Sequence, residues 1–355
     1  MSLPPILENS FEEPSSPERP RKRRTGRAIF IILGSLVLIA ALVAGGYVFN
    51  LANTFDSNSG KIEQAFPEES NRPKPAEPVN GTSPKNILLM GSDSRGATEV
   101  DAVNGTPTDQ RADTLMLLHI PADRKNVYTV SLMRDLWVDI PGHGQSKINS
   151  ALAYGGVPLM VQTVESLFDQ RIDHVAMVDF EGFKGLTDAL GGVEVNVPTA
   201  FTSTHGNFSF TPGPNVMNGD QALAFVRERY AFADGDYQRV RNQQAFLKAL
   251  IGKTISSETL TNPVTINKMV QSISPFVSVD KSLDSGALAG LGLELRDVRQ
   301  QDIAMFTLPT NGIGTSSDGQ SIVLPNPEAI ANISDAMASD TLGGYITSNN
   351  FQNGN

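Results

Sequence analysis

The stretch that decides the fold runs from residue 224 to 250 and reads A-F-V-R-E-R-Y-A-F-A-D-G-D-Y-Q-R-V-R-N-Q-Q-A-F-L-K-A-L. Its second half predicts a helix, because D-G-D at 234–236 is a start signal and neither Pro nor Gly interrupts the next fifteen residues. Just upstream, the apolar run predicts a short helix that is capped at Asn218 or Asp220 and ends near two arginines.

One face of the longer predicted helix begins polar and becomes apolar. At about 100° per residue, Asp236, Arg239 and Gln243 share a face, and apolar residues continue it further along. Such a face suits a ligand with a charged head and a hydrocarbon tail.

Arginines are concentrated around this helix start. Arg227, Arg229 and Arg239 each carry a planar, permanently charged fork that matches phosphate oxygens. The alternative is an ordinary amphipathic helix whose exposed arginines pair with Glu228 and Asp234.

The N-terminal part contains a predicted membrane anchor. Residues 28–52 form twenty-five uncharged positions, which is long enough to cross a bilayer. Six basic residues precede them, so the positive-inside rule places the N-terminus in the cytoplasm. A cleaved signal peptide is the competing interpretation, but the run exceeds a normal h-region and lacks a clear cleavage pattern. We therefore expect a single-pass protein of the cell membrane with its catalytic domain outside the cell.

Composition limits the function classes. The net charge is −10, and the chain after residue 27 has 22 Lys and Arg against 34 Asp and Glu, a net charge of −12 (22 − 34). Bulk charge therefore argues against nucleic-acid binding by the exported part. Cysteine is absent from the sequence, which excludes disulfides and thiol chemistry.

Five segments follow from these patterns: a disordered cytoplasmic tail (1–27), the anchor (28–52), a Pro-rich extracellular linker (53–84), a folded catalytic domain (85–340) and a flexible tail (341–355). Within the domain, strands alternate with helices, which predicts an α/β fold, a single α/β/α sandwich. Strands are expected at 87–90, 115–120, 127–133, 174–178, 193–197 and 303–308, and helices at 157–168, 180–190, 263–273, 283–295 and 327–338.

Charged residues stand beside the ends of the predicted strands. Asp93 and Asp113 are suited to hold Mg²⁺, with Mn²⁺ as the alternative ion, because such ions prefer carboxylate and phosphate oxygens. A simple Asx turn is the other interpretation of Asp93. Together with Arg111, Arg134 and the arginines above, the set fits a pyrophosphate and predicts phosphoryl transfer. His119, His143 and His174 are interpreted as structural.

Several blocks in a fixed order resemble the LytR–CpsA–Psr family of cell-wall glycopolymer ligases. They are N-I-L-L-M-G-S-D-S-R, R-A-D-T-L-M-L-L, V-S-L-M-R-D, K-I-N-S-A-L-A-Y-G-G, F-E-G-F-K-G-L-T-D-A-L-G-G-V-E-V-N-V-P, N-G-D-Q-A-L-A-F-V-R-E-R and D-Y-Q-R-V-R-N-Q-Q-A-F-L-K-A-L. The resemblance covers residues 85–255 in detail and extends loosely to about residue 338.

The resemblance implies an activity and its partners. Such enzymes move a glycopolymer with one phosphate from polyprenyl pyrophosphate in the membrane to peptidoglycan. The residues of the last block look like those of the actinobacterial branch of the family, in which arabinogalactan would be the polymer. A pyrophosphatase that acts on the same lipid carrier and a non-catalytic lipid-binding regulator of the cell envelope are the rival functions.

The resemblance also assigns roles to residues of this sequence. Asp93 and Asp113 match the acids that hold Mg²⁺, and Asp236 is a candidate base for the acceptor hydroxyl. The residues that match the remaining catalytic positions are Arg111, Arg134, Arg227, Arg229, Arg239 and Gln243. The expected substrate-binding residues, including an apolar pocket for the lipid, are Lys147, Phe225, Phe246, Leu247 and Leu250. Ordinary core packing is the alternative for each of the apolar ones.

Overall fold

The structure is a computed structural model that describes residues 25–92 and 112–351, without the side chains of residues 25–41, Ser92 and Asp113. The chain divides into two compact units, residues 1–49 and 50–355, which are described separately. Helix α1 (Thr25–Asn58) begins in the first unit and contains the predicted anchor. In the part of the chain open to this test, no helix combines the length and apolar character needed to cross a membrane.

A mixed β-sheet organises the described part of the second unit. The order of its strands is β1 (Gly60–Ile62), β12 (Val277–Asp280), β7 (His174–Asp179), β2 (Lys85–Ser92), β3 (Ala112–Ile120), β4 (Val127–Leu132) and β13 (Ile303–Thr307). The pairs β1–β12, β2–β7 and β4–β13 are parallel, and the other neighbouring pairs are antiparallel. The predicted α/β fold is confirmed, with a mixed sheet.

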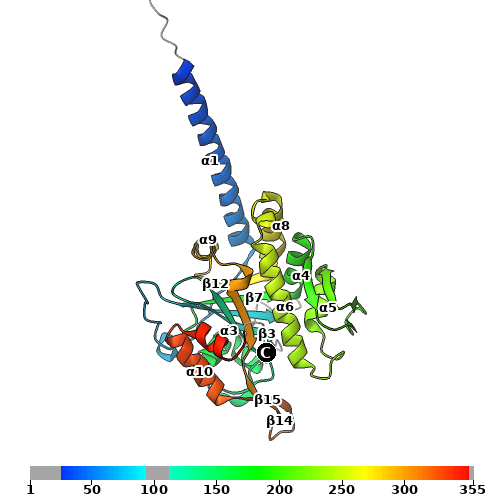
Figure 1. Cartoon of the computed structure of the whole chain (residues 1–355). Coiled ribbons are helices and arrows are strands. Elements are labelled where there is room, and N and C mark those ends of the chain that lie inside the picture. The colour runs from blue at the N-terminus through cyan, green and yellow to red at the C-terminus, as the bar shows by residue number, and fades with distance from the viewer. Residues whose placement is uncertain (1–24, 93–111, 352–355) are drawn as a thin grey trace, which may run out of the picture. The chain divides into compact units, whose positions relative to one another are not determined.

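Helices cover both faces of this sheet (Figure 1). One apolar cluster joins the sheet to α3 (Ser150–Phe168), α10 (Pro327–Ala338) and α11 (Leu342–Ser348). A second cluster joins the other face to α6 (Asp236–Thr254) and α9 (Ser285–Glu294). Side chains alternate along a strand, so in β2 Leu88 belongs to the first cluster and Ile87 packs against the second.

A third apolar cluster positions the candidate site. It joins α4 (Phe180–Ala189), α5 (Gly219–Arg227) and the antiparallel pair β8 (Val193–Val197) and β11 (Gly213–Met217) to α6. The predicted cap of the shorter helix is confirmed, because Asn218 and Gln221 form a reciprocal capping box at the start of α5. The segment between β8 and β11 contains a small hairpin of β9 (Phe201–Thr202) and β10 (Ser209–Phe210).

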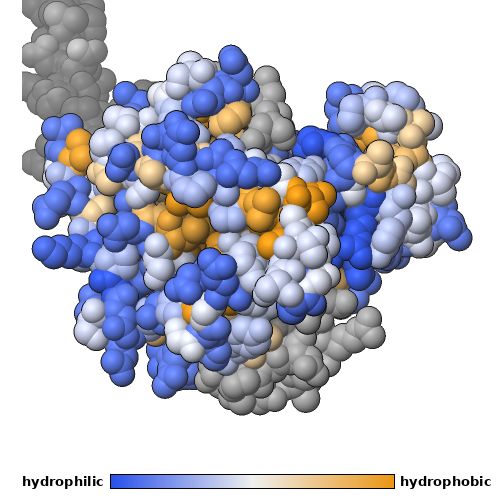
Figure 2. All heavy atoms as spheres, turned by 90° about the horizontal axis from the view of Figure 1, so that it is seen from below, coloured by the Kyte–Doolittle hydropathy of each residue, from blue (hydrophilic) through white to orange (hydrophobic). Residues whose placement is uncertain are grey.

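The remaining elements lie outside the seven-stranded sheet. They are the hairpins β5 (Trp137–Ile140) with β6 (Gly144–Lys147) and β14 (Thr310–Thr315) with β15 (Ser321–Pro325), the helices α7 (Ser257–Leu260) and α8 (Pro263–Ile273), and the short 3₁₀ helices η1 (Glu69–Asn71), η2 (Ser274–Phe276) and η3 (Gln300–Asp302). Hydrophilic residues dominate the face drawn in Figure 2, and apolar residues surface there only in patches. That distribution is ordinary for a domain whose large apolar residues lie in its core.

The segment predicted to be a free linker (53–84) is largely part of the folded domain. Ile62 and Ala65 are buried in the core, and β1 extends the sheet beside β12. The guanidinium of Arg72 donates to Glu165 at 2.7 Å and to the carbonyl of Ile172 at 2.5 Å. A Pro-rich composition predicted solvent exposure, but these few apolar and charged residues have long-range partners that composition does not reveal.

The C-terminal segment also differs from the predicted flexible tail (341–355). Residues 342–348 form α11, in which Leu342 and Ile346 are buried. The ring of Phe351 stacks on that of Phe306, with centroids 5.4 Å apart. Apolar residues are few in this polar segment, so the sequence alone does not indicate that Phe351 packs against β13.

Candidate active site

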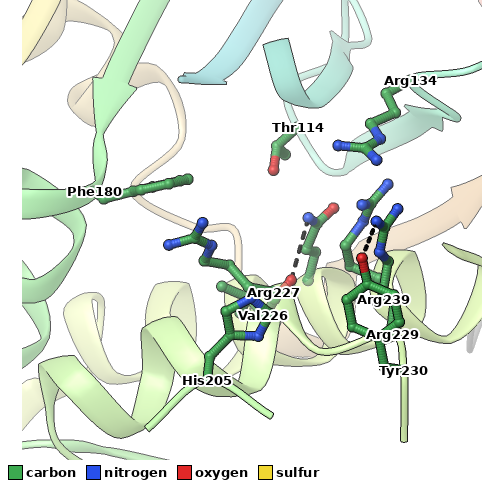
Figure 3. Close-up of a pocket in the computed structure, with 10 residues that line it drawn as sticks. Thr114, Arg134, Phe180, His205, Val226, Arg227, Arg229, Tyr230 and Arg239 are labelled. Atoms are coloured by element: carbon green, nitrogen blue, oxygen red, sulfur yellow. Dashed lines mark hydrogen bonds between the residues drawn. The ribbon is translucent and has the colours of Figure 1, made fainter. Parts of the chain in front are cut away.

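Two adjoining cavities lie where the sheet meets α4, α5 and α6. The first is rich in arginine (Figure 3) and is lined by Thr114, Arg134, Phe180, His205, Val226, Arg227, Arg229, Tyr230, Arg239 and Gln243. The second is apolar and is lined mainly by side chains of β2, β3, α4 and α6. Thr114, Phe180, Val226 and Gln243 line both. A charged compartment therefore adjoins an apolar one.

Arg227 is placed by the packing of α5 on α4. It is the last residue of α5, and its guanidinium carbon lies 4.6 Å from the centroid of the Phe180 ring. Gly219 allows this close approach, since a Cβ there would lie 2.7 Å from the carbonyl oxygen of Lys184. The cation–π contact holds the guanidinium at the junction of the two cavities.

Asp236 lies between two arginines of the charged cavity. Its Oδ1 is 3.3 Å from Nη1 of Arg239 and 3.6 Å from Nη1 of Arg229. Arg229 also donates to the hydroxyl of Tyr230, and this hydrogen bond is the main cause of the raised pKa of Arg229. Arg239 is only 5% exposed. Asp236 therefore holds two guanidinium groups of the charged cavity side by side.

Arg134 enters the charged cavity from the segment that follows β4. Its Nε lies 3.7 Å from Oδ2 of Asp135, while Nζ of Lys147 lies 3.4 Å from Oδ1 of the same carboxylate. Lys147 is not among the residues that line either cavity. The predicted substrate-binding lysine therefore contacts the site through Asp135 in this structure.

Gln243 marks the boundary between the two compartments. Its side-chain amide donates to the carbonyl of Val226 at 3.4 Å, which ties α6 to the last turn of α5. Phe246, Leu247 and Leu250 follow it along α6 and line the apolar cavity with Phe183 of α4. The predicted change from a polar to an apolar face along α6 matches the arrangement of the two cavities.

Phe225 does not line the apolar cavity. It is 1% exposed and packs in the third cluster, with its ring centroid 5.4 Å from that of Phe210. On α5, residues 225 and 226 point in different directions, so Val226 faces the cavities and Phe225 the core. Core packing, the alternative for this residue, is what the structure shows.

The predicted charge pairing of an ordinary surface helix is absent from the described residues. Glu228 accepts backbone N–H groups of Arg229 and Ala231, both at 3.0 Å, and Asp234 pairs with Arg241. Among the described contacts, neither Glu228 nor Asp234 forms an ion pair with an arginine of the charged cavity, as an ordinary amphipathic helix would require.

The predicted metal site lies largely outside the described residues. Asp93 and Arg111 fall in the undescribed segment, and Asp113 is part of β3, without a described side chain. Ser92 pairs with Ala112 across β2 and β3, so the two aspartates directly follow paired positions in the chain. The side chains open to inspection contain no cluster of three or more acidic or histidine residues that could hold a metal ion.

Sequence reasoning overlooked His205, which lines the charged cavity. It treated the other histidines as structural, and their contacts agree: His119 is hydrogen bonded to Asn86 at 2.8 Å, and His174 contacts Asp280 at 3.3 Å. Phe180 was expected in a helix, without a role in the site. Nothing local in the irregular segment around residue 205 indicates which side chain turns toward the arginines.

The fold places an arginine-rich cavity beside an apolar one, and this pair of cavities is the candidate site. The chain matches the LytR_cpsA_psr family model over residues 47–339, and it belongs to the LytR–CpsA–Psr family.

Named relatives and a solved structure support this assignment. The chain is 34% identical over 238 residues to polyisoprenyl-teichoic acid–peptidoglycan teichoic acid transferase TagU of Bacillus cereus, covering 66% of this chain and 74% of TagU. It is also 34% identical over 281 residues to the probable cell wall biosynthesis protein LcpB of Corynebacterium glutamicum, covering 77% and 65%. The structure of TagT bound to LI-WTA superposes with a TM-score of 0.61 at 25% identity, covering 79% of this chain and all of TagT.

Proposed function

We propose that this protein is a transferase that moves a glycopolymer, together with one phosphate, from polyprenyl pyrophosphate to peptidoglycan. The observation that carries the proposal is the junction of the charged and apolar cavities through Thr114, Phe180, Val226 and Gln243. A polyprenyl pyrophosphate has the same two parts, an anionic head and a hydrocarbon tail. The names of TagU and of the TagT complex support the same class of reaction.

The arginines account for the main physical requirement of phosphoryl transfer. Negative charge on the transferring group must be neutralised and held in line, and fixed guanidinium groups do this without reorganising. Arg227, Arg229 and Arg239 are each held by a second group, an aromatic ring or Asp236, before any ligand arrives. The hydrocarbon chain would lie along Phe246, Leu247 and Leu250.

We propose Mg²⁺ as the cofactor, with Mn²⁺ as the alternative. Asp93 and Asp113 would hold it. Asp93 follows Ser92, the last residue of β2, which pairs with Ala112 at the start of β3, and Asp113 directly precedes Thr114, which lines both cavities. Bound there, the ion would neutralise phosphate oxygens and stabilise the leaving phosphate.

We also propose a membrane-anchored protein with its N-terminus in the cytoplasm and the second unit outside the cell. The uncharged stretch 28–52 supports this topology, because it lies within α1 and follows six basic residues in the chain. Arabinogalactan is the proposed polymer. The likeness to LcpB of Corynebacterium glutamicum supports an actinobacterial type of chain.

The test is a reconstitution with product analysis. The full-length protein in lipid vesicles is incubated with a synthetic polyprenyl-pyrophosphate arabinogalactan fragment, peptidoglycan and Mg²⁺. We expect polyprenyl phosphate and phosphodiester-linked polymer in equal amounts, and EDTA should stop both. Lipid phosphate released with free polymer phosphate, at a rate independent of peptidoglycan, would instead identify a pyrophosphatase. Tight lipid binding without turnover would indicate a regulator.

A further inference from the structure

His205 places an imidazole in the charged cavity. It comes from the loop between β9 and β10, and its side chain is 38% exposed. Figure 3 shows it on the side of the cavity where Arg227 lies. The proposed reaction requires a proton acceptor for the acceptor hydroxyl, and imidazole is the side chain that most often does this near neutral pH.

The loop that carries His205 is fixed at several points. Oγ of Ser203 donates to the carbonyl of His205 and accepts its backbone N–H, both at 3.0 Å. The backbone N–H of Thr204 donates to Oε2 of Glu228 at 2.6 Å, and its hydroxyl donates to the same oxygen at 3.0 Å. The loop is therefore attached to the segment that joins Arg227 to Arg229.

Glu228 supplies a buried negative charge beside the imidazole. Its side chain is fully buried, and Oε2 lies 3.8 Å from Nδ1 of His205. Burial alone would raise the pKa of Glu228, but hydrogen bonds from Thr204, Ala231 and Ser203 hold this pKa below its usual value. With Nδ1 turned toward this carboxylate and the Thr204 hydroxyl, Nε2 has no hydrogen-bond partner among the described residues.

Other described groups of the charged cavity are poorly suited to accept a proton. Arginines stay protonated, and the amide of Gln243 and the hydroxyl of Thr114 are weak bases. Asp236 is already engaged by two guanidinium groups, with Oδ1 3.6 Å from Nη1 of Arg229 and 3.3 Å from Nη1 of Arg239. Its contacts suit a residue that positions those arginines.

We propose that Nε2 of His205 accepts the proton of the peptidoglycan hydroxyl, an inference that rests on the proposed transferase function. The hydroxyl oxygen forms a bond to the phosphorus that carries the glycopolymer, and its proton moves to Nε2. The bond from that phosphorus to the bridging oxygen breaks, and its electron pair leaves with polyprenyl phosphate. The imidazolium then returns the proton to solvent, and Glu228 stabilises the imidazolium meanwhile.

Charged and titratable groups surround this imidazole on several elements. Glu228 faces it from the end of α5. The cavity contributes Arg134, Arg227, Arg229, Tyr230 and Arg239.

The test compares His205→Gln with the full-length wild type in the vesicle assay described above. We expect turnover to fall by about 10²–10⁴-fold, as for loss of a general base. The acidic limb of the kcat/KM profile of the wild type should disappear in the variant. Binding of the polyprenyl-pyrophosphate substrate should change by less than about threefold. A matched control is His143→Gln, because His143 stacks on Tyr154 and is not among the residues that line the cavity.

A second variant separates proton transfer from loop structure. His205→Gly removes the ring, and added imidazole should restore part of its lost turnover while leaving the control variant unchanged. A wild type that transfers polymer while His205→Gln keeps its rate and pH profile would overturn the role of His205 alone. Lost turnover that imidazole does not restore, with the acidic limb retained, would also overturn it. A wild type that releases no lipid phosphate would overturn the proposed function itself.

Discussion

Replacing Arg227 by alanine removes a preorganised donor from the junction of the two cavities. Loss of one such donor to a charge that develops in the transition state costs roughly 10²–10³-fold in kcat, or about 2.7–4 kcal/mol. Arg227→Lys keeps the charge but loses the planar fork and much of the contact with the Phe180 ring. We expect it to recover only a small part of the lost rate.

The effect of Arg227→Ala on stability should be much smaller. The contact with Phe180 at 4.6 Å is worth about 0.5–1 kcal/mol at a partly exposed site. A cation in the last turn of α5 contributes about 0.3–1 kcal/mol more. For a domain of this size, 1 kcal/mol shifts Tm by about 2–4 °C. The variant should therefore melt only a few degrees below the wild type.

Release of polyprenyl phosphate in vesicles and differential scanning calorimetry measure the two effects on the same preparations. Arg241→Ala is the matched control, since Arg241 is an arginine of the neighbouring helix α6 that pairs with Asp234 and does not line the charged cavity. The reasoning is refuted if Arg227→Ala retains wild-type turnover, or if its loss of activity simply follows a large loss of Tm.

Three further perturbations test neighbouring parts of the site. Asp236→Asn should lower turnover about tenfold, because Arg229 and Arg239 lose the carboxylate that positions them, and the pH profile of kcat/KM should stay unchanged. Loss of the acidic limb of that profile would instead identify Asp236 as the base. Leu223→Trp should fill the apolar cavity and raise KM about tenfold for a long polyprenyl substrate, but not for a short-chain analogue. Equal effects on both substrates would contradict binding of the hydrocarbon chain in this cavity. Burial raises the pKa of Asp179, so the stability linked to its protonated form is present below about pH 3.9 and is lost as pH rises through the folded-state pKa. Asp179→Asn keeps a good cap for α4 and removes the buried carboxylate. The variant should therefore unfold at a higher urea concentration than the wild type at pH 7 but not at pH 3, and a less stable variant at pH 7 would refute this.

Local patterns in the sequence were enough to predict most of the elements that build the site. The capping signal at Asn218 and the D-G-D start at 234–236 define α5 and α6, because a cap and an uninterrupted run act over a few residues. The periodicity of α6 also predicted that Arg239 and Gln243 share a face with apolar residues further along. These features depend on neighbours in the chain.

Features that depend on distant partners could not be predicted in this way. Phe225 and Leu247 are both apolar and close to the arginines, yet only Leu247 reaches the apolar cavity, because the third cluster takes up the face of α5 that carries Phe225. The position of His205 depends on hydrogen bonds from its loop to Glu228. The role of Ile62 in the core requires β12, a strand far along the chain.

The most direct measurement is a crystal structure of the protein with a polyprenyl-pyrophosphate glycan bound. The account predicts that the pyrophosphate lies among Arg227, Arg229 and Arg239, and that the hydrocarbon chain passes Gln243 and runs along Leu247. A pyrophosphate bound elsewhere, or a hydrocarbon chain that leaves the apolar cavity empty, would contradict it.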